Sequence, residues 1–288
     1  MVIVSHAFGT FPARGTIAID RAGIIGIGTI ITTEIIQIQN QGGDTLYYQI
    51  EINDSSANWT FDDDTTIRNL GSVGAGGSVT FSPKLKRQEP SGDVEETFNI
   101  IIRAFLDSGY TNKIWEYTWP IDVYIVDFKD SPNWIVAQEW NWDDGTPQGW
   151  EIEFANNGGV TDIVSIVAGG YSWYQNKFSG IASSKYAGLS LPSGSQVLLV
   201  GYLAYKGSKS DSYVKDFEVL FAGNTVLLLP GYLAGNNGAL TTSQSLTGWW
   251  QFVVDLTDYK GQTGDLQIRN GSYYATLYFD NLMIVYKP

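Results

Sequence analysis

Short runs of strand-forming residues, separated by glycine-rich turns at intervals of about ten residues, leave few folds open to this chain. The 288 residues include 32 glycines, many of them in Ser-Gly, Asn-Gly and Gly-Gly steps. Ile, Val, Thr, Tyr and Trp dominate the stretches between these steps, and such residues favour strands over helices. The pattern predicts an all-β protein built from sandwiches or barrels.

The clearest predicted strand covers residues 46–52. Large apolar side chains stand at every second position of this strand: Leu46, Tyr48, Ile50 and Ile52. Side chains at alternate positions of a strand point to the same face of a sheet. The strand is therefore expected to be antiparallel and half-buried, with Gln49 and Glu51 on the opposite face.

Two further strands are predicted near the C-terminus, over residues 250–256 and 277–286. In the first, Phe252, Val254 and Leu256 share one face. In the second, the apolar face changes phase at Asp280-Asn281. Both strands are apolar on much of their surface, so they need a second sheet to cover them.

The chain divides into two predicted sandwich domains, residues 1–128 and 134–288, joined by a linker over residues 129–133. The first domain carries the motifs Asn-x-Gly-Gly-Asp, Tyr-x-Ile-x-Ile and Leu-Gly-Ser-Val-Gly-Ala-Gly-Gly-Ser-Val-Thr-Phe. In these motifs it resembles the immunoglobulin-like modules of prokaryotic surface proteins. The resemblance implies a β-sandwich that serves as a spacer or packing unit and has no shared chemistry.

The second domain opens with Trp134-Ile-Val-Ala-Gln-Glu-Trp-Asn-Trp-Asp-Asp-Gly-Thr-Pro-Gln-Gly-Trp150. It closes with Asp-Leu-Thr-x-Tyr-x-Gly-Gln at residues 255–262 and a final strand that contains Phe-Asp-Asn. Both ends resemble galactose-binding-like jelly rolls and carbohydrate-binding modules. The resemblance implies a jelly-roll sandwich.

The same resemblance implies a structural calcium ion, because jelly rolls of this kind often hold Ca²⁺ between the first and last strands. By position, Glu139 and Asp280 match the ligands, with Asp143 or Asp144 as additions. Carboxylate and carbonyl oxygens are the ligands that a hard cation prefers. The open alternative is an acidic turn and an Asp-Asn strand kink that hold no metal.

The abundant aromatic residues suggest a second kind of site. Sugar-binding proteins stack pyranose rings on Trp and Tyr. Tyr171 and Trp173 share one face of a predicted strand and Trp250 is expected opposite, so these three are the candidate carbohydrate-binding residues. A role in the core or in a subunit interface is favoured over a sugar platform, because an all-β core of this size needs many large residues.

Composition argues against several functions. The formal net charge of −13 disfavours nucleic-acid binding, which needs a basic surface. The chain has no cysteine and one histidine, which excludes thiolate metal sites, cysteine nucleophiles and His-rich zinc sites. Residues 17–38 are apolar but carry Asp20, Arg21 and Glu34, so no membrane insertion is expected.

No catalytic residues are predicted. Glu151 and Glu153 share one strand face, where carboxylates usually point to solvent, and no other pair suits a glycosidase. The protein is therefore expected not to be an enzyme. Three Asn-x-Ser/Thr motifs are candidate glycosylation sites: Asn53, Asn58 and Asn270.

The favoured functional hypothesis is a non-enzymatic structural or adhesion subunit. It would belong to a virion, as a capsid-associated protein, spike or fibre, or to a prokaryotic surface appendage. Its partners would be copies of itself or other structural subunits. The alternative is a carbohydrate-binding protein that recognises surface glycans, and a jelly-roll glycoside hydrolase or lyase ranks third. The Ile-rich, Cys-free composition would suit a thermophilic source.

Overall fold

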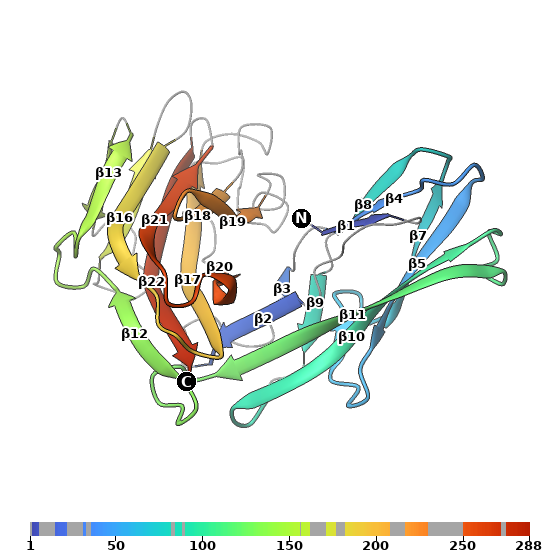
Figure 1. Cartoon of the computed structure of the whole chain (residues 1–288), viewed down its shortest axis with the longest axis horizontal. Coiled ribbons are helices and arrows are strands. Elements are labelled where there is room, and N and C mark those ends of the chain that lie inside the picture. Colours follow the sequence, from blue (N-terminus) through green and yellow to red (C-terminus); the bar gives the residue numbers. More distant parts are fainter. Residues whose placement is uncertain are drawn as a thin grey trace. The chain divides into compact units, whose positions relative to one another are not determined.

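The computed structural model describes residues 2–5, 15–21, 31–32, 36–81, 84–87, 90–155, 157–161, 171–176, 182–207, 217–229, 250–271 and 275–288. Within these residues the fold is all-β, with one short 3₁₀ turn, η3 (Thr257–Tyr259). The chain forms two compact units, and the boundary falls between Val126 and Asp127 (Figure 1). The segment predicted as a linker, residues 129–133, overlaps a hydrogen-bonded turn. In this turn the N–H of Ser131 donates to the Asp127 carbonyl at 2.7 Å.

The central sheet of the first unit has five strands, in the order β2 (Gly15–Asp20), β11 (Lys113–Val126), β10 (Val94–Phe105), β5 (Leu46–Asn53) and β7 (Ile67–Val73). β2 runs parallel to β11, and the other neighbours are antiparallel. Two three-stranded sheets accompany it: β1 (Val2–Ser5), β4 (Ile36–Gln39) and β8 (Ser78–Phe81), and β3 (Ile31–Thr32), β9 (Lys84–Arg87) and β6 (Trp59–Phe61).

The alternation predicted for residues 46–52 is confirmed. Leu46, Tyr48, Ile50 and Ile52 are all buried, and the residues between them are only half-buried. This face of β5 shares one hydrophobic core with Ile38 of β4 and with Trp59 and Phe61 of β6. The unit is therefore a β-sandwich, and its closer likeness to immunoglobulin-like modules stays a prediction.

The second unit has two antiparallel sheets (Figure 1). The first runs β14 (Asn157–Thr161), β15 (Ser172–Asn176), β22 (Ala275–Lys287), β17 (Gln196–Gly207) and β20 (Trp250–Asp255), and β12 (Ile135–Trp140) also pairs with β22. The second runs β13 (Trp150–Phe154), β16 (Ala182–Ser190), β21 (Thr263–Asn270), β18 (Phe217–Phe221) and β19 (Asn224–Leu229). Side chains from both sheets fill one core, which makes this unit a second β-sandwich.

The phase change predicted in the last strand is confirmed. Leu277 and Phe279 point into the core before the change, and Leu282 and Ile284 do so after it. Asn281 adopts a left-handed backbone with φ of 47°, and the register of β22 against β17 shifts at this point. A β-bulge of this kind restores the apolar face after one extra residue.

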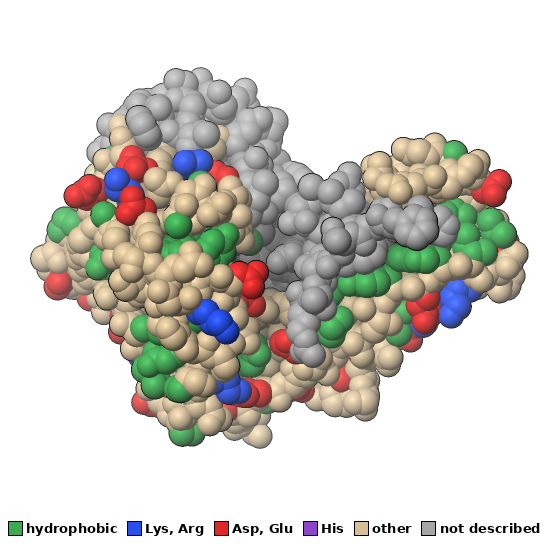
Figure 2. Space-filling view, viewed as in Figure 1, with side chains coloured by type: hydrophobic (Ala, Val, Ile, Leu, Met, Phe, Trp, Pro, Cys, Tyr) green, Lys and Arg blue, Asp and Glu red, His purple; other side chains and the backbone are tan. Residues whose placement is uncertain are grey.

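Charged side chains of both signs lie beside one another on the face drawn in Figure 2. Two ion pairs of the second unit join Lys185 with Glu153, at 3.3 Å, and Arg269 with Glu218, at 3.3 Å. Glu153 also accepts hydrogen bonds from Ser183 at 2.9 Å and Gln267 at 3.1 Å. This carboxylate is therefore bound within a surface network. No helix in the described ranges is long and apolar enough to cross a membrane.

Candidate functional site

The predicted sugar-stacking residues take different places. The Trp173 ring is 2 % exposed and its Nε1 donates to Ser184 Oγ at 2.9 Å, inside the core. A stacking platform needs an exposed ring face, so Trp173 takes the core role that the sequence analysis favours and is not a sugar platform. Tyr171 is half-buried, packs on the same core and lies over Gly145. Trp250 is in β20, but its side chain lies outside the described residues.

The predicted calcium ligands make contacts of different kinds. Glu139 forms an ion pair with Lys129. Asp280 is 1 % exposed and accepts the N–H of Asn281 at 2.8 Å, while Asp143 accepts the N–H of Tyr171 at 3.5 Å. The part of the chain that the structure describes holds no group of three or more His, Asp or Glu side chains that could bind a metal. Backbone carbonyls can also bind Ca²⁺, so the calcium site stays a prediction.

The three glycosylation motifs also differ. Asn53 is exposed at the end of β5, and Asn58 is half-buried, with its Nδ2 donating to Ser56 Oγ at 2.8 Å. Asn270 is fully buried in β21, and its Nδ2 donates to the Gln175 carbonyl at 3.5 Å. A glycan cannot be attached to a buried amide nitrogen, so Asn270 is not a glycosylation site in this fold. For Asn53 and Asn58 it stays a prediction.

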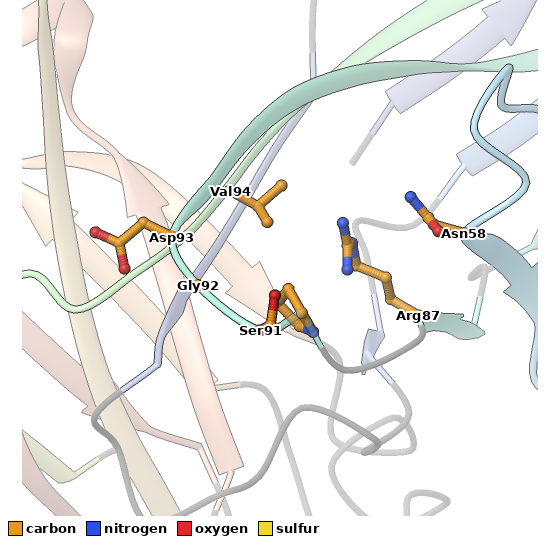
Figure 3. Close-up of a pocket in the computed structure, with 7 residues that line it drawn as sticks. Asn58, Arg87, Ser91, Gly92, Asp93 and Val94 are labelled. Atoms are coloured by element: carbon orange, nitrogen blue, oxygen red, sulfur yellow. The ribbon is translucent and has the colours of Figure 1, made fainter.

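A polar pocket of about 330 Å³ opens on the first unit (Figure 3). Seven residues line it, from the turn before β6, the end of β9 and the loop before β10: Asn58, Arg87, Pro90, Ser91, Gly92, Asp93 and Val94. In Figure 3 the Arg87 guanidinium lies between Val94 and Asn58, while the Asp93 carboxylate points away. We refer to these seven residues as the Arg87 pocket.

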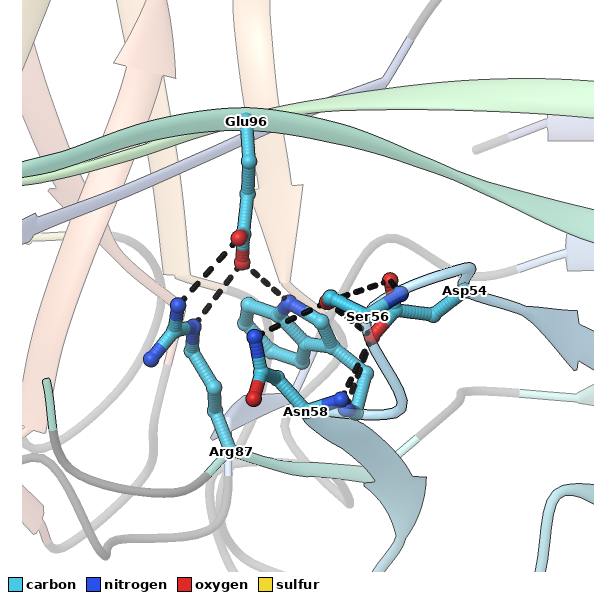
Figure 4. A network of polar contacts seen from close by, with 6 residues as sticks. Asp54, Ser56, Asn58, Arg87 and Glu96 are labelled. Carbon is cyan, nitrogen blue, oxygen red and sulfur yellow. Dashed lines mark hydrogen bonds and ion pairs between the residues drawn. The ribbon is translucent and has the colours of Figure 1, made fainter.

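The inner wall of the Arg87 pocket is fixed by buried contacts (Figure 4). Arg87 pairs with Trp59 across the β9–β6 ladder. Glu96 of β10 accepts hydrogen bonds from Arg87 Nε at 2.9 Å, from Arg87 Nη2 at 3.2 Å and from Trp59 Nε1 at 2.7 Å. The Trp59 ring in turn stacks on Phe98 with centroids 4.9 Å apart. The guanidinium is therefore held in one orientation before any ligand arrives.

The outer wall is fixed by an aspartate-centred turn. The Asp54 carboxylate accepts the backbone N–H of Asn58 at 2.7 Å and that of Trp59 at 3.1 Å (Figure 4). Partial burial alone would raise the pKa of Asp54, but the hydrogen bonds from Ser56, Asn58 and Trp59 outweigh it and lower that pKa. Asp54 therefore stays ionised at neutral pH and keeps Asn58 in place.

Both charged groups that line the Arg87 pocket have counter-charges in the protein. Arg87 faces Glu96, and Asp93 forms an ion pair with Arg21 at 3.1 Å. The side chain of Arg87 is 5 % exposed and that of Glu96 is 22 % exposed, so water screens this pair only in part. The pocket therefore offers hydrogen-bonding groups, and its positive and negative charges nearly cancel. This combination suits a polar, uncharged ligand.

Sequence reasoning missed this pocket. β10 begins at Val94 and carries Glu96 into the sheet. Arg87 and Ser91 belong to no motif, and the motif of Asn58 predicts glycosylation and not a pocket. The fold brings the three residues together, in part through the pairing of β9 with β6. One usable signal was the sequence Asn58-Trp-Thr60, since a buried Trp needs a partner for its N–H.

Comparison with known proteins finds likeness of fold only. The sequence matches no protein-family profile and no curated protein. Among solved structures, an adhesin domain of Lys-gingipain from Porphyromonas gingivalis is 15% identical, covers 53% of this chain and 99% of its own, and has a TM-score of 0.39. The CBM22-1 xylan-binding domain from Paenibacillus barcinonensis is 13% identical over 55% of this chain and 99% of its own, with a TM-score of 0.39. CBM27-1 from Caldicellulosiruptor saccharolyticus, solved with mannohexaose, is 10% identical over 53% of this chain and 97% of its own, with a TM-score of 0.37.

Proposed function

We propose that this protein is a non-catalytic carbohydrate-binding protein that acts in adhesion outside the cell. The Arg87 pocket carries the proposal, because it is preformed, polar and open to solvent. Its volume of about 330 Å³ lies near the lower end of the range for small-ligand sites, roughly 300–1,000 Å³. A pocket of this volume has room for one sugar residue, and its wall carries hydroxyl and amide groups. These features fit recognition of the terminal sugar of a glycan.

Several carboxyl groups are unsuited to the role of a catalytic acid. A glycosidase acid needs a carboxyl group whose pKa is raised. Hydrogen bonds lower the pKa of five carboxyl groups, so none of these suits that role: Asp54, Asp63, Asp107, Glu116 and Asp144. Glu153, which shares a predicted strand face with Glu151, is held by Gln267, Ser183 and Lys185.

The narrower hypothesis of a virion or appendage subunit is kept as a second proposal. Two β-sandwich units with an acidic surface would suit such a subunit, and the partner would then be another copy of the chain. Electron microscopy of the purified protein tests it, since rings, spikes or filaments would support assembly. A monodisperse monomer by light scattering would count against it.

Glycan binding is tested with the full chain on a glycan array, followed by calorimetric titration of each hit. Asn58→Ala and Ser91→Ala should each weaken binding several-fold, because each removes a polar group from the wall. Asn53→Ala is the matched control, since Asn53 is exposed at the end of β5, next to this turn, and does not line the pocket. Absence of binding to any glycan would reject the proposal.

A further inference from the structure

We infer that the Arg87 pocket selects uncharged sugars over acidic ones, and that Glu96 is the residue that sets this selectivity. The inference rests on the proposed function, since it names the class of sugar that the pocket takes. Arg87 would by itself attract a carboxylate, because a guanidinium offers a planar pair of donors that matches one. The protein already supplies that carboxylate, in the side chain of Glu96.

Glu96 contacts the Arg87 guanidinium with both of its carboxylate oxygens. Its two oxygens accept from Arg87 Nε at 2.9 Å and from Nη2 at 3.2 Å, which is a two-point contact. Glu96 is held there by a third hydrogen bond, from Trp59 Nε1 at 2.7 Å. Trp59 is fully buried and stacked on Phe98, so this anchor does not move with the surface.

An acidic sugar would bring a second carboxylate to this wall. That carboxylate would have to lie near Glu96 and contact the Arg87 guanidinium, whose charge Glu96 already balances. Like charges at short range weaken binding. The protein's net charge of −13 adds a general repulsion. A neutral sugar meets neither penalty and can still bond to the Asn58 amide and the Ser91 hydroxyl.

The test compares each neutral sugar with its own uronic acid, on the full chain at low salt. Glucose, galactose and mannose are titrated beside glucuronate, galacturonate and mannuronate, with ligand-observed nuclear magnetic resonance as the readout. We expect the wild-type protein to prefer the neutral member of the pair that binds by about tenfold or more. Equal or tighter binding of the uronate would overturn the inference while leaving glycan binding intact.

Glu96→Gln supplies the decisive variant. It removes one negative charge, yet its amide oxygen can still accept from Trp59 Nε1 and Arg87 Nε. The preference for the neutral sugar should fall by on the order of tenfold or reverse, because Arg87 is left without the Glu96 counter-charge. Glu95→Gln is the matched control, since it removes the same charge from the opposite face of β10 and should change the ratio by less than about twofold.

The double variant Arg87→Gln with Glu96→Gln completes the experiment. It replaces the ion pair with two amides, so the gain in uronate binding made by Glu96→Gln should disappear. An unchanged ratio in Glu96→Gln, or a gain that persists in the double variant, would refute the role of Glu96. If no sugar binds any of these proteins, the proposed function fails together with the inference.

Discussion

Buried indoles in the second unit differ in whether their N–H groups have a hydrogen-bond partner. Trp173 donates to Ser184 Oγ, whereas the Nε1 atoms of Trp140, Trp142 and Trp150 are buried with no hydrogen-bond partner. The rings of Trp140 and Trp150 meet edge to face, with centroids 5.7 Å apart and planes at 81°. An edge-to-face contact sets the positive ring edge against a π face, which compensates in part for a missing acceptor.

Replacing Ser184 should therefore destabilise the second unit. Ser184→Ala leaves both Trp173 Nε1 and Gln175 Oε1 without the hydroxyl that they share. Unsatisfied buried polar groups predict a loss of about 1–3 kcal/mol in the free energy of unfolding, measured by urea denaturation. Ser190→Ala, at an exposed position of the same strand, is the control and should cost little. Equal effects of the two would contradict this account.

Tyr48 differs from Ser184, because its hydroxyl is buried in the first unit and has no hydrogen-bond partner. Burial raises the pKa of Tyr48 from 10.0 to about 12. Tyr48→Phe should leave stability at pH 7 unchanged or slightly improved, since it removes an unpaired polar group.

The pH dependence of stability gives a second readout for Tyr48. Between pH 10 and about 12 the folded protein keeps the phenol protonated while the unfolded chain ionises. The unfolded state then binds fewer protons, so stability falls as the pH rises through this window. In Tyr48→Phe this fall should be smaller. An identical alkaline profile in both proteins would show that another group is responsible.

At the scale of single elements, the bulge in β22 decides how the second sandwich closes. Gly201 of β17 lies opposite the bulge, and a Cβ added there would overlap Leu282 and come within 3.2 Å of Phe252. The core therefore needs glycine at position 201 for reasons of space and not of backbone angle.

Gly201→Ala is accordingly expected to lower the free energy of unfolding by about 1–3 kcal/mol, because the extra methyl forces core side chains apart. Denaturant titration followed by tryptophan fluorescence measures this loss. Gly43→Ala is the control, since an added Cβ at Gly43 meets nothing within 4 Å. If Gly201→Ala is as stable as the wild type, the backbone at the bulge must be able to shift.

At the scale of the whole molecule, each unit buries its own hydrophobic core. The first core contains Ile50, Trp59 and Trp119, and the second contains Trp150, Trp173 and Ile284. Units with separate cores can unfold separately, because two-state behaviour is a property of a single cooperative domain.

Calorimetry of the full chain should therefore show more than one transition, or a calorimetric enthalpy clearly above the van 't Hoff enthalpy. Ser184→Ala and Gly201→Ala should lower only the transition of the second unit, and the other transition should stay in place. A single transition that shifts as a whole in both variants would show that the two units unfold together.

Much of the architecture was predictable, and the reason is local. Neighbouring residues determine both the alternation of residues 46–52 and the phase change at Asp280-Asn281. The two-residue period of a strand depends on local sequence and not on distant contacts. The functional residues were less predictable. Asn270 fits a surface role by its motif, and the sequence leaves a sugar-stacking role open for Trp173 beside the favoured core role. Their sheet partners bury both.

The amino-acid order by itself determined that this chain is all-β, because turn residues and strand formers act over a few positions. It also determined, through charge and composition, which ligand classes are disfavoured. Only the tertiary structure decided where polar groups meet: strand pairing brings Arg87 to Trp59, and β10 then places Glu96 against both. Trp59 lies 37 residues before Glu96, so long-range packing and not local sequence brings the indole to this ion pair.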